Sequence, residues 1–271
     1  MTLLEGRALA AGIRERAAAE AAAGPAPVLA AVTATDDPAT AWYLGSIAKA
    51  AAATGIELRE ERCADAAGVL ERLDALSADP GVHGIICLTP LPDGLSLSLA
   101  GERIAPAKDI DGASPASLGR LAAGLEAYAP ATAQAVIELI RISGTNLEGA
   151  HAVVVGRSTV VGKPLAMLLL AEQATVTICH TRTRDLAGET RRADVLVAAA
   201  GRAHLIGAEH VAPGALVIDV GTNEASDGSM VGDVDTAAVE PIAAAVTPVP
   251  GGVGPVTTAI LLRNAVAAAR G

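Results

Sequence analysis

The 271-residue chain contains no phenylalanine, and aromatic residues make up only 1% of it. Any folded core must therefore be built from Ala, Val, Leu and Ile. Hydrophobic residues reach 51% and charged residues only 18%, which excludes an intrinsically disordered chain. The composition predicts a packed globular protein of one large domain or two modest ones.

The chain also lacks the signals of a secreted, metal-binding or membrane protein. Its cysteines, Cys63, Cys87 and Cys179, are far apart, and neither they nor the histidines show a metal-ligand spacing. The N-terminal segment lacks the pattern of a signal peptide, and every apolar run is shorter than the roughly 20 residues that span a bilayer. We therefore expect a cytoplasmic protein without a metal or a membrane anchor.

No stretch of the sequence is strongly basic, and the net charge is −10. This charge argues against nucleic acid or an anionic membrane as the main partner. An anionic ligand would have to be bound by a few local donors.

Hydrophobic segments alternate along the chain in the manner of a parallel α/β protein. In the first half we predict helices at 5–22, 39–54 and 64–78 and strands at 27–32, 56–60 and 84–88. After a helix at 132–143, the second half has strands at 150–156, 175–180, 194–201 and 215–221, a helix at 162–172 and a closing helix. The sequence therefore predicts two α/β lobes with helices on both faces of parallel sheets.

The segment VVVGRSTVVGKP, residues 153–164, is typical of a phosphate-binding turn. A buried strand leads to Gly156, Arg157 and Ser158, and a helix opens at Gly162, where its N-terminus can bind a pyrophosphate. The spacing is G-x-S-x-x-x-G rather than G-x-G-x-x-G, so an ordinary strand-turn-helix link remains an alternative.

The next strand ends in His180, Thr181 and Arg182 instead of the acidic residue that binds the ribose of NAD. Together with Arg157, this donor-rich tip suits the additional phosphate of NADP. The alternative for Arg182 is a solvated loop end.

The segment WYLGSIAK, residues 42–49, contains a tyrosine without a neighbouring base. Six residues of helix turn through about 600°, so Lys49 points away from Tyr43. The residue one turn after Tyr43 is Ile47, which carries no proton. We expect Trp42 to be a packing residue.

Several segments, in order along nearly the whole chain, resemble the methylenetetrahydrofolate dehydrogenase/methenyltetrahydrofolate cyclohydrolase family. They are DPATAWYLGS, HGIICLTPLP, AKDIDGASP, VVVGRSTVVGKP, ICHTRT, VIDVGTN, VGDVD and TPVPGGVGPVTTAILLRN. The resemblance implies a folate-binding catalytic domain at 1–143, completed by a C-terminal helix at 254–271, and an NADP-binding Rossmann domain at 144–253. It also implies a cleft between the two and a homodimer.

The resemblance assigns roles to individual residues. Tyr43 and Asp111 match the residues that orient the folate, but the family's catalytic Lys is replaced by Ile47 and its partner Gln by Leu88. A further departure gives Ala131, Ala133 and Ala135 in place of Cys, Pro and Gly. Pro250, Gly251 and Gly252 are expected to contact substrate, and Thr222, Gly254 and Thr257 the cofactor. A flexible glycine loop, and a helix-capping role for Thr257, remain alternatives.

These substitutions affect the two family reactions differently. Hydride transfer from methylene-tetrahydrofolate to NADP chiefly requires alignment of the reactants. Hydrolysis of the methenyl product requires proton transfers, and a general acid or base contributes about 10²–10⁴-fold. We therefore expect an NADP-dependent dehydrogenase whose cyclohydrolase activity is lost or very weak. Alternatives are a folate-dependent one-carbon transfer enzyme and a folate- or NADP-binding pseudoenzyme.

Overall fold

The computed structural model describes residues 2–225 and 227–271. The chain forms two compact units. We call Ala10–Ala131 with Thr258–Gly271 the three-strand unit, and Met1–Leu9 with Thr132–Thr257 the six-strand unit. The sequence places a domain boundary after residue 143, whereas helix α6 (Ala131–Ser143) lies almost entirely in the six-strand unit.

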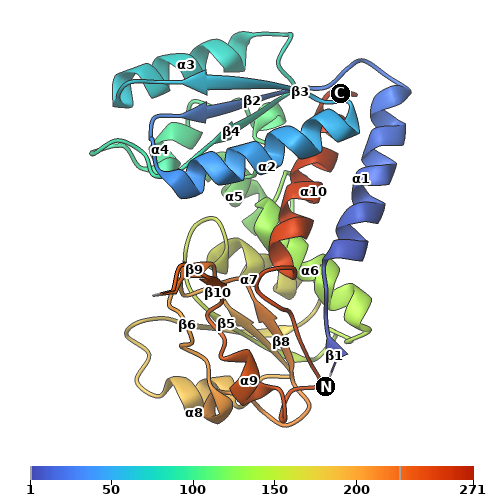
Figure 1. Ribbon diagram of the computed structural model, residues 1–271, viewed down its shortest axis with the longest axis vertical. Helices are drawn as coiled ribbons and strands as arrows, with labels where there is room; N and C mark the ends of the chain where they lie inside the picture. The colour runs from blue at the N-terminus through green and yellow to red at the C-terminus, as the bar shows by residue number, and fades with distance from the viewer. Residues whose placement is uncertain (1, 226) are drawn as a thin grey trace. The chain divides into compact units, whose positions relative to one another are not determined.

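The sheet of the three-strand unit has the order β3-β2-β4 and is parallel throughout. Its strands are β2 (Val28–Thr33), β3 (Glu57–Arg62) and β4 (Gly84–Cys87). Because β3 and β4 flank β2, right-handed crossovers place α2 (Pro38–Thr54) and α3 (Ala66–Ala78) on opposite faces. Figure 1 shows this arrangement, which confirms the predicted β-α-β-α-β order.

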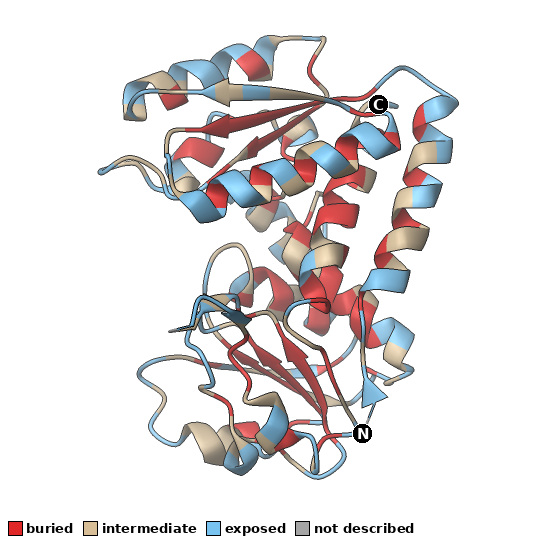
Figure 2. Ribbon diagram, viewed as in Figure 1, coloured by how far each residue is buried: buried red, intermediate tan, exposed pale blue. Residues whose placement is uncertain are grey.

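Side chains of β2 alternate between these two faces. Val28, Ala30 and Val32 pack in one cluster with Val69 and Leu73 of α3. The remaining residues of the strand, ending with Thr33, therefore face α2. All six residues of β2 are buried, so the strand forms the centre of this unit's core (Figure 2).

Local signals in the sequence set the helix ends. The carboxylate of Asp37 accepts the Thr40 backbone N–H at 2.8 Å, and α2 ends at Gly55, whose φ is +76°. At the end of α3, the Lys108 ammonium donates to the carbonyls of Leu76 and Asp79, at 3.2 and 2.6 Å. Lys108, the lysine of the AKDIDG segment, thus caps the C-terminal end of α3 through hydrogen bonds to these carbonyls.

The sheet of the six-strand unit has the order β1-β11-β8-β7-β5-β6. The four predicted strands are confirmed as β5 (His151–Val155), β6 (Thr175–Cys179), β7 (Val195–Ala198) and β8 (Leu216–Asp219). Two further strands, β1 (Thr2–Leu3) and β11 (Ala245–Val246), were not predicted; they have two residues each and continue the parallel sheet.

The other elements were partly predicted. Predicted helices are confirmed as α1 (Arg7–Ala22), α7 (Gly162–Ala171) and α10 (Val253–Ala268). Short elements not predicted are α4 (Leu97–Gly101), η1 (Pro106–Lys108), α5 (Pro115–Ala122), α8 (Leu186–Thr190), η2 (Ala208–His210), α9 (Thr236–Val239) and the pair β9 (Asn223–Glu224) and β10 (Met230–Val231). Within the described residues, no helix has the length and apolarity needed to cross a membrane.

Candidate functional site

The turn after β5 is closed by two glycines that no other residue can replace without a shift of the backbone. Gly156 has a φ of +143°, and a Cβ there would lie 2.1 Å from the carbonyl oxygen of Ala199. A Cβ at Gly162 would lie 2.2 Å from the carbonyl oxygen of Gly156. The two glycines thus allow close backbone contact at the start of α7.

Ser158 organises the N-terminus of α7. Its hydroxyl oxygen accepts the backbone N–H groups of Val161 and Gly162, at 3.1 and 3.4 Å. The hydroxyl proton remains able to donate to another acceptor. Arg157 is exposed beside it, and the helix N-terminus adds its partial positive charge. These groups form an anion-binding corner.

The tip of β6 lies next to this corner, because Gly156 donates its N–H to the carbonyl of Cys179 at 2.9 Å. His180 Nδ1 accepts the Arg182 N–H at 3.0 Å, and Thr183 Oγ1 accepts the His180 N–H at 2.9 Å. The tip is therefore a tight turn with exposed Thr181 and Arg182. The structure brings these predicted residues to the same carboxyl edge as the turn after β5.

Two buried aspartates at this edge were missed by the sequence analysis. Asp219, at the end of β8, accepts the N–H groups of Gly221, Asp233 and Val234. Burial raises the pKa of Asp219 to about 6, although these N–H donors act to lower it.

Asp233 in turn accepts the N–H groups of Ala200, Gly201 and Arg202, the loop that follows β7. The two carboxylates fix the loops after β7 and β8, and the exposed Thr222 lies in the second of these loops. In the sequence, the features that could have indicated this network are Asp219 in the segment VIDVG and Asp233 in the segment VGDVD.

The segment before α10 has a defined conformation. Gly251 has a φ of +115°, and a Cβ on Gly252 would lie 2.7 Å from the Pro248 carbonyl oxygen. The Gly6 N–H donates to the Gly251 carbonyl at 2.9 Å. These contacts favour a loop of fixed shape over the alternative of a flexible glycine loop. Pro250 is exposed, whereas both glycines are buried.

Gly254 and Thr257 both lie within α10, and Gly254 is exposed. The Thr257 hydroxyl donates to the Val253 carbonyl at 3.3 Å, so Thr257 is bonded inside the helix and does not cap it.

Tyr43 and Asp111 come together in the three-strand unit. Burial, together with the charge of Asp111, raises the pKa of Tyr43, so its hydroxyl stays protonated at neutral pH. Burial raises the pKa of Asp111 to about 7, opposed by a hydrogen bond from the Ala131 N–H and reinforced by the charge of Asp109. That N–H lies 3.3 Å from Asp111 Oδ1. Asp111 can therefore gain or lose a proton near neutrality.

The two residues at the positions where the family resemblance expects Lys and Gln are apolar and buried. Ile47, on the inner face of α2, is 0% exposed, and Leu88, directly after β4, is 7% exposed. Neither side chain can donate, accept or transfer a proton. The expectation for Trp42 was wrong, because this side chain is 66% exposed and does not pack in the core.

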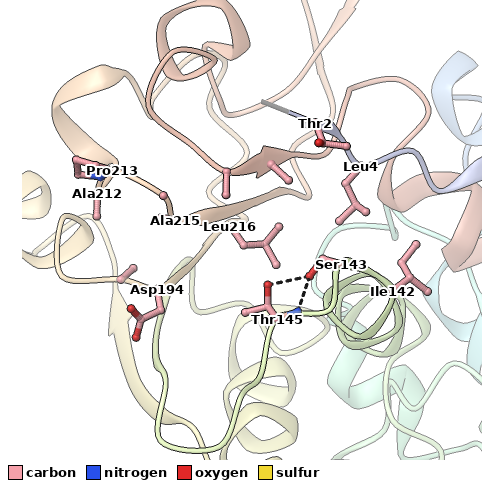
Figure 3. A pocket seen from close by; sticks show the side chains of 14 residues that line it. Thr2, Leu4, Ile142, Ser143, Thr145, Asp194, Ala212, Pro213, Ala215 and Leu216 are labelled. Carbon is pink, nitrogen blue, oxygen red and sulfur yellow. Dashed lines mark hydrogen bonds between the residues drawn. The ribbon is translucent and has the colours of Figure 1, made fainter.

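A cavity of about 450 Å³ lies in the six-strand unit, at the opposite edge of its sheet (Figure 3). Its walls include Leu216 and Ala245, at the amino ends of β8 and β11, and the segment around Ser143 and Thr145. None of the predicted site residues lines it. Among the described residues, no cluster of His, Cys, Asp and Glu could bind a metal ion.

A parallel sheet with a glycine-closed turn after one strand and donors at the tip of the next defines a dinucleotide-binding α/β protein. Two family models identify it further. Residues 4–111 match the catalytic domain of tetrahydrofolate dehydrogenase/cyclohydrolase, and residues 130–271 match the NAD(P)-binding domain of the same family. The chain belongs to the tetrahydrofolate dehydrogenase/cyclohydrolase family.

Relatives agree with this assignment. The "Bifunctional protein FolD" of Parafrankia sp. (strain EAN1pec) is 53% identical over 276 residues, which cover 100% of both chains. The crystal structure of the FolD methylenetetrahydrofolate dehydrogenase/cyclohydrolase of Campylobacter jejuni has a TM-score of 0.96 at 40% identity and covers 100% of this chain and 99% of its own. The Trypanosoma brucei dehydrogenase-cyclohydrolase, complexed with NADP cofactor and inhibitor, has a TM-score of 0.93 at 34% identity, covering 100% of this chain and 97% of its own.

Proposed function

We propose that the protein is an NADP-dependent methylenetetrahydrofolate dehydrogenase whose cyclohydrolase activity is lost or very weak. The observation that carries the proposal is the pair Ile47 and Leu88, two buried apolar residues at the positions of the family's catalytic Lys and its partner Gln. The proposal departs from the printed names of the relatives, which describe bifunctional proteins.

The turn after β5 fits a dinucleotide, because the missing Cβ atoms of Gly156 and Gly162 leave room for close backbone approach. NADP, when bound, supplies the acceptor for the hydride. Ser158 and the N-terminus of α7 would bind the pyrophosphate, and Arg157 with Arg182 would bind the additional phosphate of NADP. The NADP complex of the Trypanosoma brucei relative supports this choice of cofactor.

In the three-strand unit, Tyr43 and Asp111 would orient the folate. The protonated Tyr43 hydroxyl is a donor, and the Asp111 carboxylate can accept the N–H groups of the pterin ring. Pro250, Gly251 and Gly252 would supply backbone contacts to the substrate. Alignment of this kind is the main requirement of the dehydrogenase step.

Hydrolysis of the methenyl product requires proton transfers in addition to alignment. Water must be deprotonated and the ring nitrogen protonated, and neither Ile47 nor Leu88 can take part. The raised pKa of Tyr43 makes its hydroxyl a poor base. Asp111 is the remaining group that titrates near neutrality, and orienting the pterin already occupies it. Loss of a positioned acid or base lowers the rate by about 10²–10⁴-fold.

The domain roles follow the two family models, whose descriptions are a catalytic domain and an NAD(P)-binding domain, whereas the homodimeric state rests on the family resemblance alone. We propose a folate-binding N-terminal domain, an NADP-binding C-terminal domain and a dimer of identical chains. Size-exclusion chromatography with light scattering tests the last of these.

Restoring the family pair tests the proposal directly. Ile47→Lys with Leu88→Gln should create cyclohydrolase activity, measured as formyl-tetrahydrofolate formed from methenyl-tetrahydrofolate. Ile47→Met with Leu88→Gln is the matched control, because it provides similar length and polarity but no amine. A folded Lys/Gln variant that hydrolyses no faster than the Met/Gln control would show that these two positions do not explain the loss.

A further inference from the structure

The hydroxyl of Thr33 stands out among the buried polar groups. Its residue is 3% exposed, and of the buried side-chain nitrogen and oxygen atoms in the described residues, the Thr33 hydroxyl alone has no hydrogen-bond partner. An unpartnered buried hydroxyl is destabilising, and native proteins keep few of them. Such a group therefore requires an explanation.

The hydroxyls of other buried threonines donate hydrogen bonds to backbone carbonyls. Thr40 donates to the Thr89 carbonyl at 2.7 Å, and Thr54 donates to the Ala50 carbonyl at 2.7 Å. Thr190 donates to the Ala187 carbonyl at 3.3 Å. The unpaired state of Thr33 is thus a feature of its position and not of threonines in this fold.

That position is the carboxyl end of β2, the central strand of its sheet. Open parallel sheets bind ligands at this edge. Thr33 faces α2, whose buried side includes Ile47. The Leu88 N–H donates to the Val32 carbonyl at 2.9 Å, which continues the pairing of β4 with β2 and makes Leu88 the neighbour of Thr33 on the same face.

We propose that Thr33 is a specificity-determining residue of the folate pocket, whose hydroxyl hydrogen-bonds to the bound folate directly or through one water. This inference rests on the proposed folate site. Leu88 beside Thr33, and Ile47 on the buried side of α2 that Thr33 faces, offer it no polar group. A rotation about χ1 exchanges the hydroxyl and methyl positions, so the hydroxyl can turn toward a ligand at the strand end.

An unpaired hydroxyl that serves a ligand has a distinctive consequence. Its removal stabilises the free protein and weakens the complex, whereas removal of a bonded structural hydroxyl destabilises the free protein. Thr33→Val, which keeps the shape of the side chain, should therefore raise the melting temperature by a few degrees. The same variant should lower the affinity for tetrahydrofolate about 5- to 30-fold.

Binding can be followed through quenching of Trp42, the one tryptophan of the chain, which neighbours Tyr43. Tetrahydrofolate titrations would compare the wild type with Thr33→Val, Thr33→Ser and Thr54→Val. Thr33→Ser should retain the affinity because it keeps the hydroxyl. Thr54→Val should leave the affinity unchanged and lower the melting temperature, because it removes a bonded hydroxyl.

Three results would overturn the inference. Unchanged affinity in Thr33→Val would show that the hydroxyl does not serve the ligand, and a lower melting temperature would show that it has a structural partner. A wild type that binds tetrahydrofolate but forms no NADPH would contradict the proposed dehydrogenase while leaving the test of Thr33 readable. A wild type that binds no tetrahydrofolate would overturn both.

Discussion

The two predicted binding regions of the protein are built in different ways. The turn after β5 depends on backbone geometry, since Gly156 and Gly162 leave no room for a Cβ. The predicted folate site depends on side chains, with Tyr43 and Asp111 as its polar groups and the buried Ile47 one helical turn after Tyr43. We expect a substitution at either glycine to disturb the fold of the turn. A substitution at Ile47 should instead change which chemical groups the site offers and leave the strands and helices intact.

This difference separates the parts that the fold fixes from the parts that an exchange of side chains can alter. Position 47 can hold an isoleucine in place of the lysine that the family resemblance expects without loss of the helix, because the apolar Leu44 and Ala51 are buried one turn to either side of it. Membership of the family therefore determines the architecture and the nucleotide turn. The side chains of the pocket determine which reactions follow.

The largest effect is expected from Gly156→Ala. The new Cβ would meet the Ala199 carbonyl oxygen at 2.1 Å, and the φ of +143° is strained for alanine. NADP binding should fall at least 100-fold, as measured by nucleotide titration, and stability should fall by a few kcal/mol.

Gly45→Ala is the matched control for this change. Gly45 lies within α2, and a Cβ there would meet no atom within 4 Å. Alanine should raise the stability by roughly 0.5–1 kcal/mol and leave NADP binding unchanged. Comparable losses in both variants would contradict the account of the turn.

An intermediate effect is expected from Arg157→Ala. A hydrogen bond to a charged group contributes about 1.5–3 kcal/mol, so the KM for NADP should rise roughly 10- to 100-fold. The KM for NAD should change little, because NAD lacks the additional phosphate. Arg184→Ala, at an exposed arginine just after the same strand tip, is the control. An equal loss for NAD and NADP would remove the assignment of Arg157.

The smallest effect is expected from the titration of Asp111, which should change the stability and the substrate binding in opposite directions as the pH rises. Burial raises the pKa of Asp111 to about 7, above its usual 3.8. Between these values the folded state binds more protons than the unfolded state, so the free energy of unfolding falls as the pH rises through this window. Asp111→Asn removes the titration, and its stability relative to the wild type should be greater at pH 8 than at pH 4 by roughly 1–3 kcal/mol, a range that allows for partial solvent exposure.

The kinetics of the wild type should show the opposite trend. The ionised carboxylate is the stronger acceptor for the pterin N–H groups, so kcat/KM for the folate should rise with pH as Asp111 ionises. Urea unfolding and initial rates at several pH values measure the two trends. Asp93→Asn, at an exposed loop, is the control. A stability difference between Asp111→Asn and wild type that is constant with pH would contradict the raised pKa.

Much of this structure was predictable from short-range signals. The glycine after β5, the proline and aspartate at the start of α2 and Gly55 at its end are local requirements that appear directly in the sequence. The sequence also places Ile47 and Leu88 where the family resemblance expects Lys and Gln, a comparison that needs only the positions of two residues. The roles of these site residues stay predictions.

Other features depend on contacts between distant segments. The hydrogen bonds between Asp219, Asp233 and the loop at Ala200–Arg202 join three separate parts of the chain. The strands β1 and β11 have two residues each, too short for a periodic pattern, and are strands because they pair with each other. Thr33 lies one residue beyond the predicted strand at 27–32, and its unpaired hydroxyl appears only when its neighbours in space are known.

The most direct test of the central claim follows both reactions in one sample. The protein is incubated with methylene-tetrahydrofolate and NADP, and the methenyl and formyl products are separated by chromatography as NADPH accumulates. We predict that NADPH and methenyl-tetrahydrofolate form together, while formyl-tetrahydrofolate appears no faster than in a reaction to which methenyl-tetrahydrofolate is added without enzyme. Formyl-tetrahydrofolate formed at a rate close to that of NADPH would contradict the claim and show a bifunctional enzyme that works without the lysine.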